Sequence, residues 1–289
     1  ACPCSIAPSA TGSATALAFA KINLTLDVLR ARDDGYHDVE SLVVGVGLCD
    51  VVTAAVADRA GVSVSCADAT LRGDANLAVR AARRLAEASE QTASLAISLT
   101  KGIPVGAGLG GGSSDAATTL AVCNRLWSLG WDRSALARVG AEIGSDVPVF
   151  FHLPAAVMTG RGEHVIGVSP AWSGWVVLVA VGVRVSTAAV YAAWRPRDGS
   201  AAELGALMSN HLEPAVFRVC PAVARAHEAL TRLGVAPVRV SGAGSALYML
   251  LDDYDGASEA AARVRREAIG RCVCVLRAPV GGALCGEDA

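Results

Sequence analysis

The chain has 289 residues and a formal net charge of −2, with 53 % apolar and 4 % aromatic residues. This length suits a large core divided between two lobes, and the near-neutral charge argues against nucleic-acid binding. The two most apolar segments, residues 42–57 and 175–183, are too short or too interrupted to provide the roughly 18–20 apolar residues that cross a bilayer. We therefore predict that both are buried strands, and we expect no membrane partner.

Nine cysteines form an odd count without a C-x-x-C pair, and the five histidines show no H-x-x-x-H spacing. Neither a disulfide framework nor a zinc site is predicted, and we expect reduced thiols in a cytoplasmic protein. Residues 1–14 are small and polar, without a basic region followed by an apolar run, so we expect a disordered lead-in and no secretory signal.

Strand patterns dominate the first part of the chain and give way to helices at helical spacing. In chain order we predict strands at residues 15–29, 42–47, 51–56 and 62–66, a helix at 76–89, a strand at 95–100, helices at 114–129 and from Asp132 to Ile143, and a strand at 155–159 before a turn at 160–162. Asp132 is the expected N-cap of its helix.

The pattern changes after about Glu163, where the second lobe is expected to begin. We predict strands at residues 175–181, 238–241, 247–251 and 272–276, and helices at 187–194, 201–208, 212–219, 222–233 and 257–269. The chain thus divides into a lead-in (1–14), a first lobe (15–163) and a second lobe (164–289).

The most informative motif is the glycine-rich stretch at residues 101–117. It holds six glycines between Gly102 and Gly112, then two hydroxyl side chains and an alanine-rich helical pattern from about Asp115. Each glycine in an ordered segment costs about 0.5–1 kcal/mol relative to alanine, so a purely structural role explains the run poorly. Bare backbone N–H groups at the start of a helix bind anions. We therefore predict a phosphate-binding loop.

Other interpretations of this loop compete. A flexible linker would lack the strand before it and the helix after it, and a tight turn needs only one or two glycines. A loose G-x-G-x-x-G at Gly106, Gly108 and Gly111 would indicate NAD binding, but the expected acidic residue after a second strand is replaced by a helix-to-helix turn at residues 129–132. The Walker A pattern fails because no Gly-Lys-Ser/Thr follows the loop.

Lys21 and Asn23 share one face of an otherwise apolar strand. The lysine either reaches solvent at the strand end or points into a cleft, where it would suit a developing negative charge. The sequence leaves these two alternatives evenly balanced.

Three further segments carry polar groups with a possible chemical role. A hairpin signal at residues 34–35 precedes Tyr36 and His37, a pair suited to holding a nucleobase or similar ring. Asp146 follows a predicted helix end and is either a turn residue or a partly desolvated carboxylate able to act as a base. Residues 240–246 form a second glycine turn, either a tight hairpin or a backbone wall against a ligand.

Taken together, these motifs resemble the GHMP kinase superfamily, named for galactokinase and for homoserine, mevalonate and phosphomevalonate kinases. The resemblance runs from about Ala18 to Leu251 and is most specific at residues 20–24, 34–37, 104–117, 144–150 and 160–163. The lysine combined with Gly-Tyr-His is similar to the branch that phosphorylates a cytidylyl methylerythritol in non-mevalonate isoprenoid synthesis. Departures from the family pattern are Phe19 in place of proline, residues 152–154 in place of a glycine-containing turn, and Ala243 in place of a frequent serine.

The resemblance implies an α+β, two-lobed GHMP-kinase-like fold, with an N-terminal ribosomal-protein-S5-like lobe and a C-terminal α/β sandwich lobe. It implies that the first lobe (15–163) binds ATP and that the second (164–289) is the substrate-side lobe. It also implies a catalytic pair, Lys21 and Asp146, and the cofactors ATP and Mg²⁺. The residues implied for ATP are Asn76, Lys101, Pro104, Val105, Gly106, Ala107, Gly108, Leu109, Gly110, Gly111, Gly112, Ser113, Ser114 and Asp115. Those implied for the cytidylyl substrate are Asn23, Tyr36, His37, Thr187, Tyr191 and Gly242. Metal ligands stay unassigned, with Ser113, Ser114 and Asp115 as candidates.

The implied reaction is ATP-dependent phosphorylation of the substrate's 2-hydroxyl. Asp146 would orient this hydroxyl and accept its proton, while Lys21 would keep Asp146 ionised and offset charge on the acceptor oxygen. Two alternatives stay open: a homoserine or mevalonate kinase of the same superfamily, which needs no nucleobase clamp, and an inactive nucleotide-binding relative. Monomer and homodimer are equally compatible with the sequence.

Overall fold

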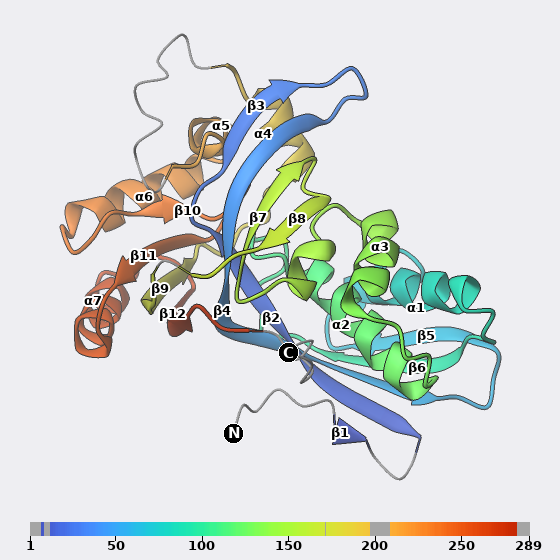
Figure 1. The fold of residues 1–289 in the computed structure, drawn as a ribbon. Helices are drawn as coiled ribbons and strands as arrows, with labels where there is room; N and C mark the ends of the chain where they lie inside the picture. The colour runs from blue at the N-terminus through green and yellow to red at the C-terminus, as the bar shows by residue number, and fades with distance from the viewer. Residues whose placement is uncertain (1–6, 9–11, 171, 197–208, 282–289) are drawn as a thin grey trace.

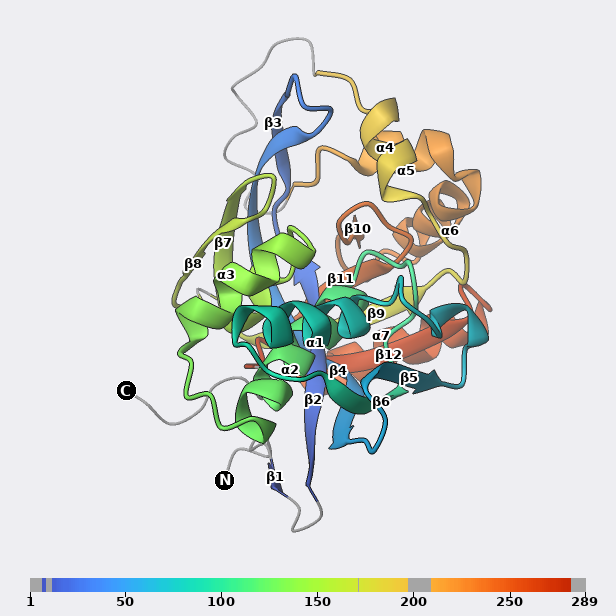
Figure 2. The same ribbon diagram turned by 90° about the vertical axis from the view of Figure 1, so that its right-hand side faces the viewer.

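The computed structural model describes residues 7–8, 12–170, 172–196 and 209–281. Within them the chain forms two β-sheets that pack face to face, with helices on the outer side of each (Figures 1 and 2). This arrangement confirms the expected two-lobed α+β fold. The helix expected at residues 201–208 lies outside the described residues. No helix in the described ranges is both long and apolar enough to cross a membrane.

The 20-residue strand β4 organises the first sheet. β2 and β6 run antiparallel to β4, β7 pairs with its first half, and β5 lies parallel to β6 at the edge. The strands of this sheet are β1 (Ala7–Pro8), β2 (Ser13–Asn23), β3 (Asp27–Ala31), β4 (His37–Val56), β5 (Gly61–Cys66), β6 (Ser94–Thr100), β7 (Ala155–Gly160) and β8 (His164–Gly167).

Two strand predictions for this sheet were wrong. The strand expected at residues 15–29 is interrupted after Asn23, because the next two backbone amides both donate to the carbonyl of Leu42. The strands expected at 42–47 and 51–56 are a single strand, because a register shift against β2 absorbs the residues between them.

The limits of the first lobe also differ from expectation. Ser13 and Ala14 belong to β2, and Ala7–Pro8 pairs with that strand, so these residues are part of the sheet rather than of a lead-in. The other lead-in residues, 1–6 and 9–11, lie outside the described part. β8 pairs with β7, so the first sheet continues past the boundary expected at Glu163.

Helices α1, α2 and α3 lie together on the outer face of the first sheet (Figure 1). Asn76 and Asp132 cap α1 and α3 through their side-chain oxygens. α2 begins earlier than expected because Gly110, with a φ of 71°, is its N-cap, so the glycine loop itself supplies the first helical turn. The elements on this side are η1 (Ala69–Leu71), α1 (Leu77–Ala88), α2 (Gly111–Leu126), α3 (Arg133–Ile143) and η2 (Pro148–Phe151).

The second sheet is antiparallel throughout its described strands, in the order β10-β11-β9-β12. Its outer face packs against α5, α6 and α7, while α4 packs beside α5 (Figure 2). The elements are β9 (Gly174–Ala180), α4 (Thr187–Ala193), α5 (Glu213–Val219), α6 (Pro221–Arg232), β10 (Arg239–Val240), β11 (Leu247–Leu251), α7 (Tyr254–Arg266) and β12 (Cys272–Ala278).

Strand β2 changes its packing partner at the register shift after Phe19. Before the shift, its even-numbered residues from Ala14 to Ala18 pack toward the helices. After the shift, Ala20 and Ile22 pack between the two sheets, as does Leu24 just past the strand end. Lys21 and Asn23 therefore project from the opposite face, where Lys21 lies beside the start of α2. The irregularity in the strand directs both polar side chains toward the cavity described below.

Candidate active site

A cavity of about 970 Å³ lies between the two lobes, near the upper end of the roughly 300–1,000 Å³ usual for small-molecule sites. It takes wall residues from β2, the β3–β4 hairpin, the glycine loop, α4 and the second glycine turn. All of the predicted site residues except Ser114 line it: Lys21, Asn23, Tyr36, His37, Asn76, Lys101, Pro104 to Ser113 without a gap, Asp115, Asp146, Thr187, Tyr191 and Gly242.

Lys21 and Asp146, which are far apart in the chain, face each other in this cavity. Lys21 Nζ lies 3.7 Å from Asp146 Oδ2, and the lysine side chain is 5 % exposed against 42 % for the aspartate. Burial lowers the pKa of Lys21, although Asp146 acts in the opposite direction. The lysine thus points into the cleft rather than to solvent, and the pair places a proton acceptor beside a cation.

Asn23 holds Lys21 from the other side. Its Oδ1 accepts from Lys21 Nζ at 2.6 Å, and its Nδ2 donates to Ser41 Oγ at 2.7 Å. Ser41 in turn donates to the carbonyl of Thr25 at 2.5 Å. This chain fixes the amide orientation, so the ammonium is directed at Asp146. Ser41 was missed in the sequence because a lone serine in an apolar strand carries no signal.

The glycine loop packs against the second glycine turn so closely that side chains would not fit. A Cβ on Gly108, whose φ is 79°, would lie 2.2 Å from the carbonyl oxygen of Ser241. Ser241 Oγ donates to the carbonyl of Gly108 at 3.0 Å, and the amide of Ala246 donates to that of Ala107 at 2.9 Å. The second turn is therefore a backbone wall that supports the loop.

No side chain caps the start of α2, so the first amide N–H groups of the helix remain available to an anion. Residues Gly111, Gly112 and Ser113 form this turn and line the cavity. A side chain at Gly110 would lie 2.7 Å from the ring of Phe150 and 3.1 Å from Lys21, which explains a glycine at the N-cap. The loop is shaped to receive negatively charged oxygens near Lys21.

Asn210 was also missed, since it lies outside any predicted strand or helix. Its Nδ2 donates to the carbonyls of Val240 at 2.9 Å and Gly242 at 2.8 Å. Gly242 in turn lies beside Asn23 and Lys21, where a Cβ would be 3.2 Å from Asn23 Oδ1. Asn210 thereby anchors the second glycine turn beside Lys21, at the end of the cavity that holds the Lys21–Asp146 pair.

Lys101 lies at the base of the loop in a buried cluster with Asp50 and Asp115. Its Nζ bonds to Asp50 Oδ2, and to Asp115 Oδ2 at 2.5 Å. Asp50 Oδ1 also accepts from the amides of Gly102 at 2.6 Å and Ile103 at 2.8 Å. The ammonium of Lys101, a residue that the resemblance implies for ATP, is bound by two carboxylates. Asp50, which is fully buried, was not among the predicted site residues.

The charges in this cluster do not balance, because two carboxylates share one lysine. Burial raises the pKa of Asp115 to about 7, with Lys101 acting against the shift and Asp50 adding to it. Burial alone would lower the pKa of Lys101, but Asp115 and Asp50 together raise it. Asp115 Oδ1 is buried without a hydrogen-bond partner.

Two predicted ATP residues have their side chains engaged elsewhere. Ser114 is 1 % exposed, and its hydroxyl donates to the carbonyl of Phe19 at 2.7 Å, because its place on the first turn of α2 faces β2. The hydroxyl is therefore engaged with β2, and the assignment of Ser114 to ATP or a metal stays a prediction. Asn76 caps α1 and donates to the carbonyl of Leu71 at 2.7 Å, so it shapes the cavity wall.

Aromatic rings gather at the other end of the cavity. The His37 ring lies 5.1 Å from that of Tyr191 and 5.4 Å from that of Trp194, measured between centroids. Tyr36 beside it is 53 % exposed. Burial, and secondarily the charge of Asp146, raise the pKa of Tyr191. Trp194 was missed because nothing in its sequence context pointed to His37.

No group of three or more His, Cys, Asp or Glu side chains in the described residues is arranged to hold a metal ion. Two side chains near the start of α2 each offer one oxygen: the hydroxyl of Ser113 and the unpartnered Oδ1 of Asp115.

Two family models match the chain. The model of the GHMP kinases N terminal domain matches residues 76–153, and that of the GHMP kinases C terminal matches residues 189–270. The first match covers the glycine loop and Asp146, and the second covers α4 and the second glycine turn.

Curated relatives are similar over most of their length. A 4-diphosphocytidyl-2-C-methyl-D-erythritol kinase of Geobacter sp. (strain M21) is 40 % identical over 262 residues, 86 % of this chain and 94 % of the relative. The kinase of the same name from Pelobacter propionicus is 38 % identical over 264 residues, 87 % of this chain and 94 % of the relative.

Solved structures agree with these matches. A crystal structure of 4-(cytidine 5′-diphospho)-2C-methyl-D-erythritol kinase is 34 % identical with a TM-score of 0.75, covering 91 % of this chain and 99 % of its own. Homoserine kinase from Cytophaga hutchinsonii, at 18 % identity and a TM-score of 0.70 over 96 % and 97 % of the two chains, shares the fold. The chain therefore belongs to the GHMP kinases and, within them, to the family of 4-diphosphocytidyl-2-C-methyl-D-erythritol kinases.

Proposed function

We propose that this protein transfers a phosphoryl group from ATP to the 2-hydroxyl of 4-(cytidine 5′-diphospho)-2-C-methyl-D-erythritol. The observation that carries the proposal is the 3.7 Å approach of Lys21 and Asp146 in a cavity that also contains the glycine loop and the Tyr36–His37 pair. The names of the curated relatives support the same reaction.

Asp146 and Lys21 would act directly on the acceptor alcohol. Asp146 exposes its carboxylate to the cavity, where it would orient the hydroxyl and accept its proton as the new P–O bond forms. Lys21 would offset the negative charge that develops on the attacking oxygen and on the transferred group. Because Asn23 and burial hold the ammonium in place, little reorganisation is needed when the charge develops.

The glycine loop and the start of α2 would bind the ATP phosphates. The free amide groups at this helix N-terminus face the cavity, and the helix dipole favours anions there. The reacting phosphate would then lie near both the start of α2 and Lys21, since Gly110, the N-cap of α2, lies beside the Lys21 side chain. Positioning of this kind supplies most of the rate enhancement in phosphoryl transfer.

The residues at the start of α2 fit a hard cation such as Mg²⁺, which prefers oxygen ligands and shares them with substrate phosphates. Ser113 lines the cavity, and Asp115 Oδ1 is a buried oxygen without a partner. These two residues would hold Mg²⁺ together with phosphate oxygens. The ion would neutralise charge on the phosphates when bound.

Tyr36, His37 and Tyr191 would hold the cytosine ring. A base stacked on an aromatic side chain gains about 1–3 kcal/mol, so Tyr36→Ala should raise the KM for the cytidylyl substrate about 5- to 150-fold and leave the KM for ATP nearly unchanged. Tyr254→Ala is a matched control, because Tyr254 is also 53 % exposed but lies on α7. An equal rise in both KM values would remove the stacking role.

A coupled assay of ADP release tests the proposed reaction. ATP turnover should require the cytidylyl substrate and should not occur with mevalonate or homoserine. Turnover with either of those alcohols would favour another kinase of the superfamily, which needs no aromatic clamp. Absence of ADP release with all three alcohols would favour an inactive nucleotide-binding relative.

A further inference from the structure

The turn between β7 and β8 lies between the aromatic end of the cavity and the reacting pair. The guanidinium of Arg161 lies over the Tyr36 ring, 4.9 Å from its centroid. The next residue, Gly162, lies beside the carboxylate, since a Cβ there would be 3.5 Å from Asp146 Oδ1. Both turn residues line the cavity. Arg161 is thus located between the proposed nucleobase site and the proposed reaction site.

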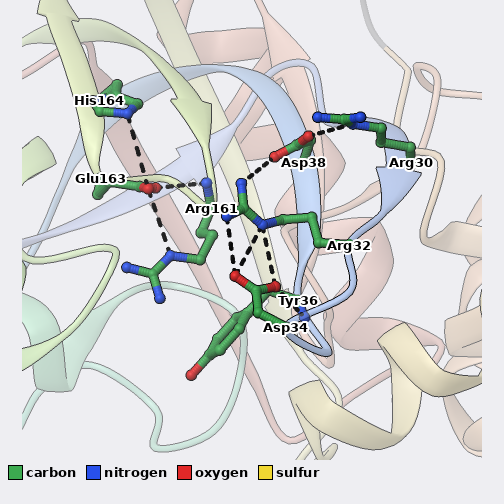
Figure 3. A network of polar contacts seen from close by, with 8 residues as sticks. All are labelled: Arg30, Arg32, Asp34, Tyr36, Asp38, Arg161, Glu163 and His164. Carbon is green, nitrogen blue, oxygen red and sulfur yellow. Dashed lines mark hydrogen bonds and ion pairs between the residues drawn. The ribbon is translucent and has the colours of Figure 1, made fainter.

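The neighbouring arginines of the β3–β4 hairpin have their charges neutralised (Figure 3). Arg32 bonds to Asp38 at 2.7 Å and to Asp34 at 3.1 Å. Arg30 donates to Asp38 at 2.6 Å and is 76 % exposed. These two guanidinium groups are therefore committed to carboxylates on their own hairpin.

Arg161 is only partly neutralised. Its Nε lies 3.5 Å from Glu163 Oε1, while the other oxygen of Glu163 accepts from the backbone amide of Arg161 at 2.5 Å (Figure 3). Among the described residues, no carboxylate pairs with the two terminal nitrogens of this guanidinium. They retain N–H donors for an anionic ligand in the cavity.

Both lysines of the cavity wall are committed to protein groups. Lys101 is bound by Asp50 and Asp115, and Lys21 is bound by Asn23 beside Asp146. Arg72 is held through Nε, which donates to the carbonyl of Cys66 at 2.7 Å, but it follows η1 rather than the β7–β8 turn that lies beside both Tyr36 and Asp146. A diphosphate that joins a base at Tyr36 to an alcohol at Asp146 would carry two negative charges past Arg161.

We propose that Arg161 binds the diphosphate group of the cytidylyl substrate. The inference rests on the proposed function for the identity of that substrate. The planar guanidinium can donate two parallel hydrogen bonds to phosphate oxygens while it stays stacked on Tyr36. It thereby selects a nucleoside diphosphate over a plain nucleoside and sets the distance between the base and the reacting hydroxyl.

Binding of CDP and of cytidine tests this role without catalysis. Isothermal titration calorimetry would measure CDP directly and cytidine by displacement, on the full chain and on Arg161→Met. Hydrogen bonds to charged groups are worth about 1.5–3 kcal/mol, so Arg161→Met should weaken CDP binding about 10- to 150-fold and change cytidine affinity less than about three-fold. Arg30→Met is the matched control, because it removes an arginine of the hairpin network outside the cavity wall.

An unchanged ratio of CDP to cytidine affinity in Arg161→Met would overturn the inference, as would an equal loss in the Arg30→Met control. Arg161→Lys keeps the charge but loses the planar pair of donors, so its preference for CDP should lie between those of the unaltered protein and of Arg161→Met. A preference no larger than that of Arg161→Met would contradict a charged contact with phosphate. If neither compound binds the unaltered protein, the proposed nucleobase site fails as well. Normal binding with an unchanged ratio in Arg161→Met overturns only the role of Arg161.

Discussion

The cavity contains two lysine–aspartate clusters with opposite properties. At the reaction end, Lys21 meets Asp146 at 3.7 Å, and the aspartate side chain is 42 % exposed. At the base of the glycine loop, Lys101 is bonded to both Asp50 and Asp115, whose side chains are 0 % and 4 % exposed. The same residue types thus form a loose, accessible pair in one place and a tight, buried cluster in the other.

This difference separates a group arranged for chemistry from a group that, apart from the unpartnered Oδ1 of Asp115, is arranged for structure. Asp146 keeps oxygen atoms accessible from the cavity, so it can bind and deprotonate a substrate hydroxyl. One oxygen of Asp50 accepts hydrogen bonds from two backbone amides of the loop, and the other is bonded to Lys101. Removing a charge at the first site should therefore slow the reaction, and removing one at the second should destabilise the fold.

The largest effect on activity is expected for Lys21→Met. Loss of a positioned cation or proton-transfer group typically slows the chemical step about 10²–10⁴-fold, so kcat should fall by this factor while the KM for ATP changes little. The unfolding free energy should not decrease, because a buried ammonium is replaced by an apolar chain of similar length. Steady-state kinetics and chemical denaturation measure the two quantities. A marked decrease in the unfolding free energy would instead indicate that Lys21 has a structural role.

The largest effect on stability is expected for Lys101→Met. The substitution leaves two buried carboxylates without their cation, and breaking a buried ion pair on one side costs about 3–5 kcal/mol. Urea denaturation would measure the change. Arg83→Met is the control, because Arg83 and Asp74 form an exposed pair whose loss should cost less than about 1 kcal/mol. A change no larger than that of the control would contradict a structural role for the cluster.

A smaller, pH-dependent effect is expected from Asp115. Its pKa is raised from 3.8 to about 7, so between these values the folded state holds a proton that the unfolded state releases. The unfolding free energy should therefore fall as the pH rises from about 4 to about 7 and level off above that. Asp115→Asn lacks this contribution, so the stability of the unaltered protein relative to the variant should decline over the same interval. A difference independent of pH would contradict the shifted pKa.

Local patterns in the sequence predicted most of the fold. Asp132 preceded a run with helical spacing, and the structure shows it as the cap of α3. The alternation over residues 95–100 predicted β6 in the same way. The interruption after Asn23 and the continuity of β4 could not be predicted, because both depend on pairing between strands rather than on either strand alone.

The site was less predictable than the fold. Lys21 and Asp146 were each singled out from their local sequence, but only the resemblance to a family joined them as a pair. Their convergence depends on the register shift in β2 and on the turn after α3. Asp50 was read only as an interruption of an apolar run, since its partners lie about fifty or more residues away. The bond from the Ser114 hydroxyl to Phe19 could not be predicted either, because the sequence does not show which side of the first helical turn faces β2.

The most direct test of the division between the two clusters is the kinetics of Asp146→Asn, an isosteric change that removes the carboxylate. With the cytidylyl substrate and ATP, kcat should fall at least about 100-fold, whereas calorimetric affinity for the cytidylyl substrate and the unfolding free energy should stay close to those of the unaltered protein. A kcat near that of the unaltered protein would contradict the assignment of Asp146 to the reaction.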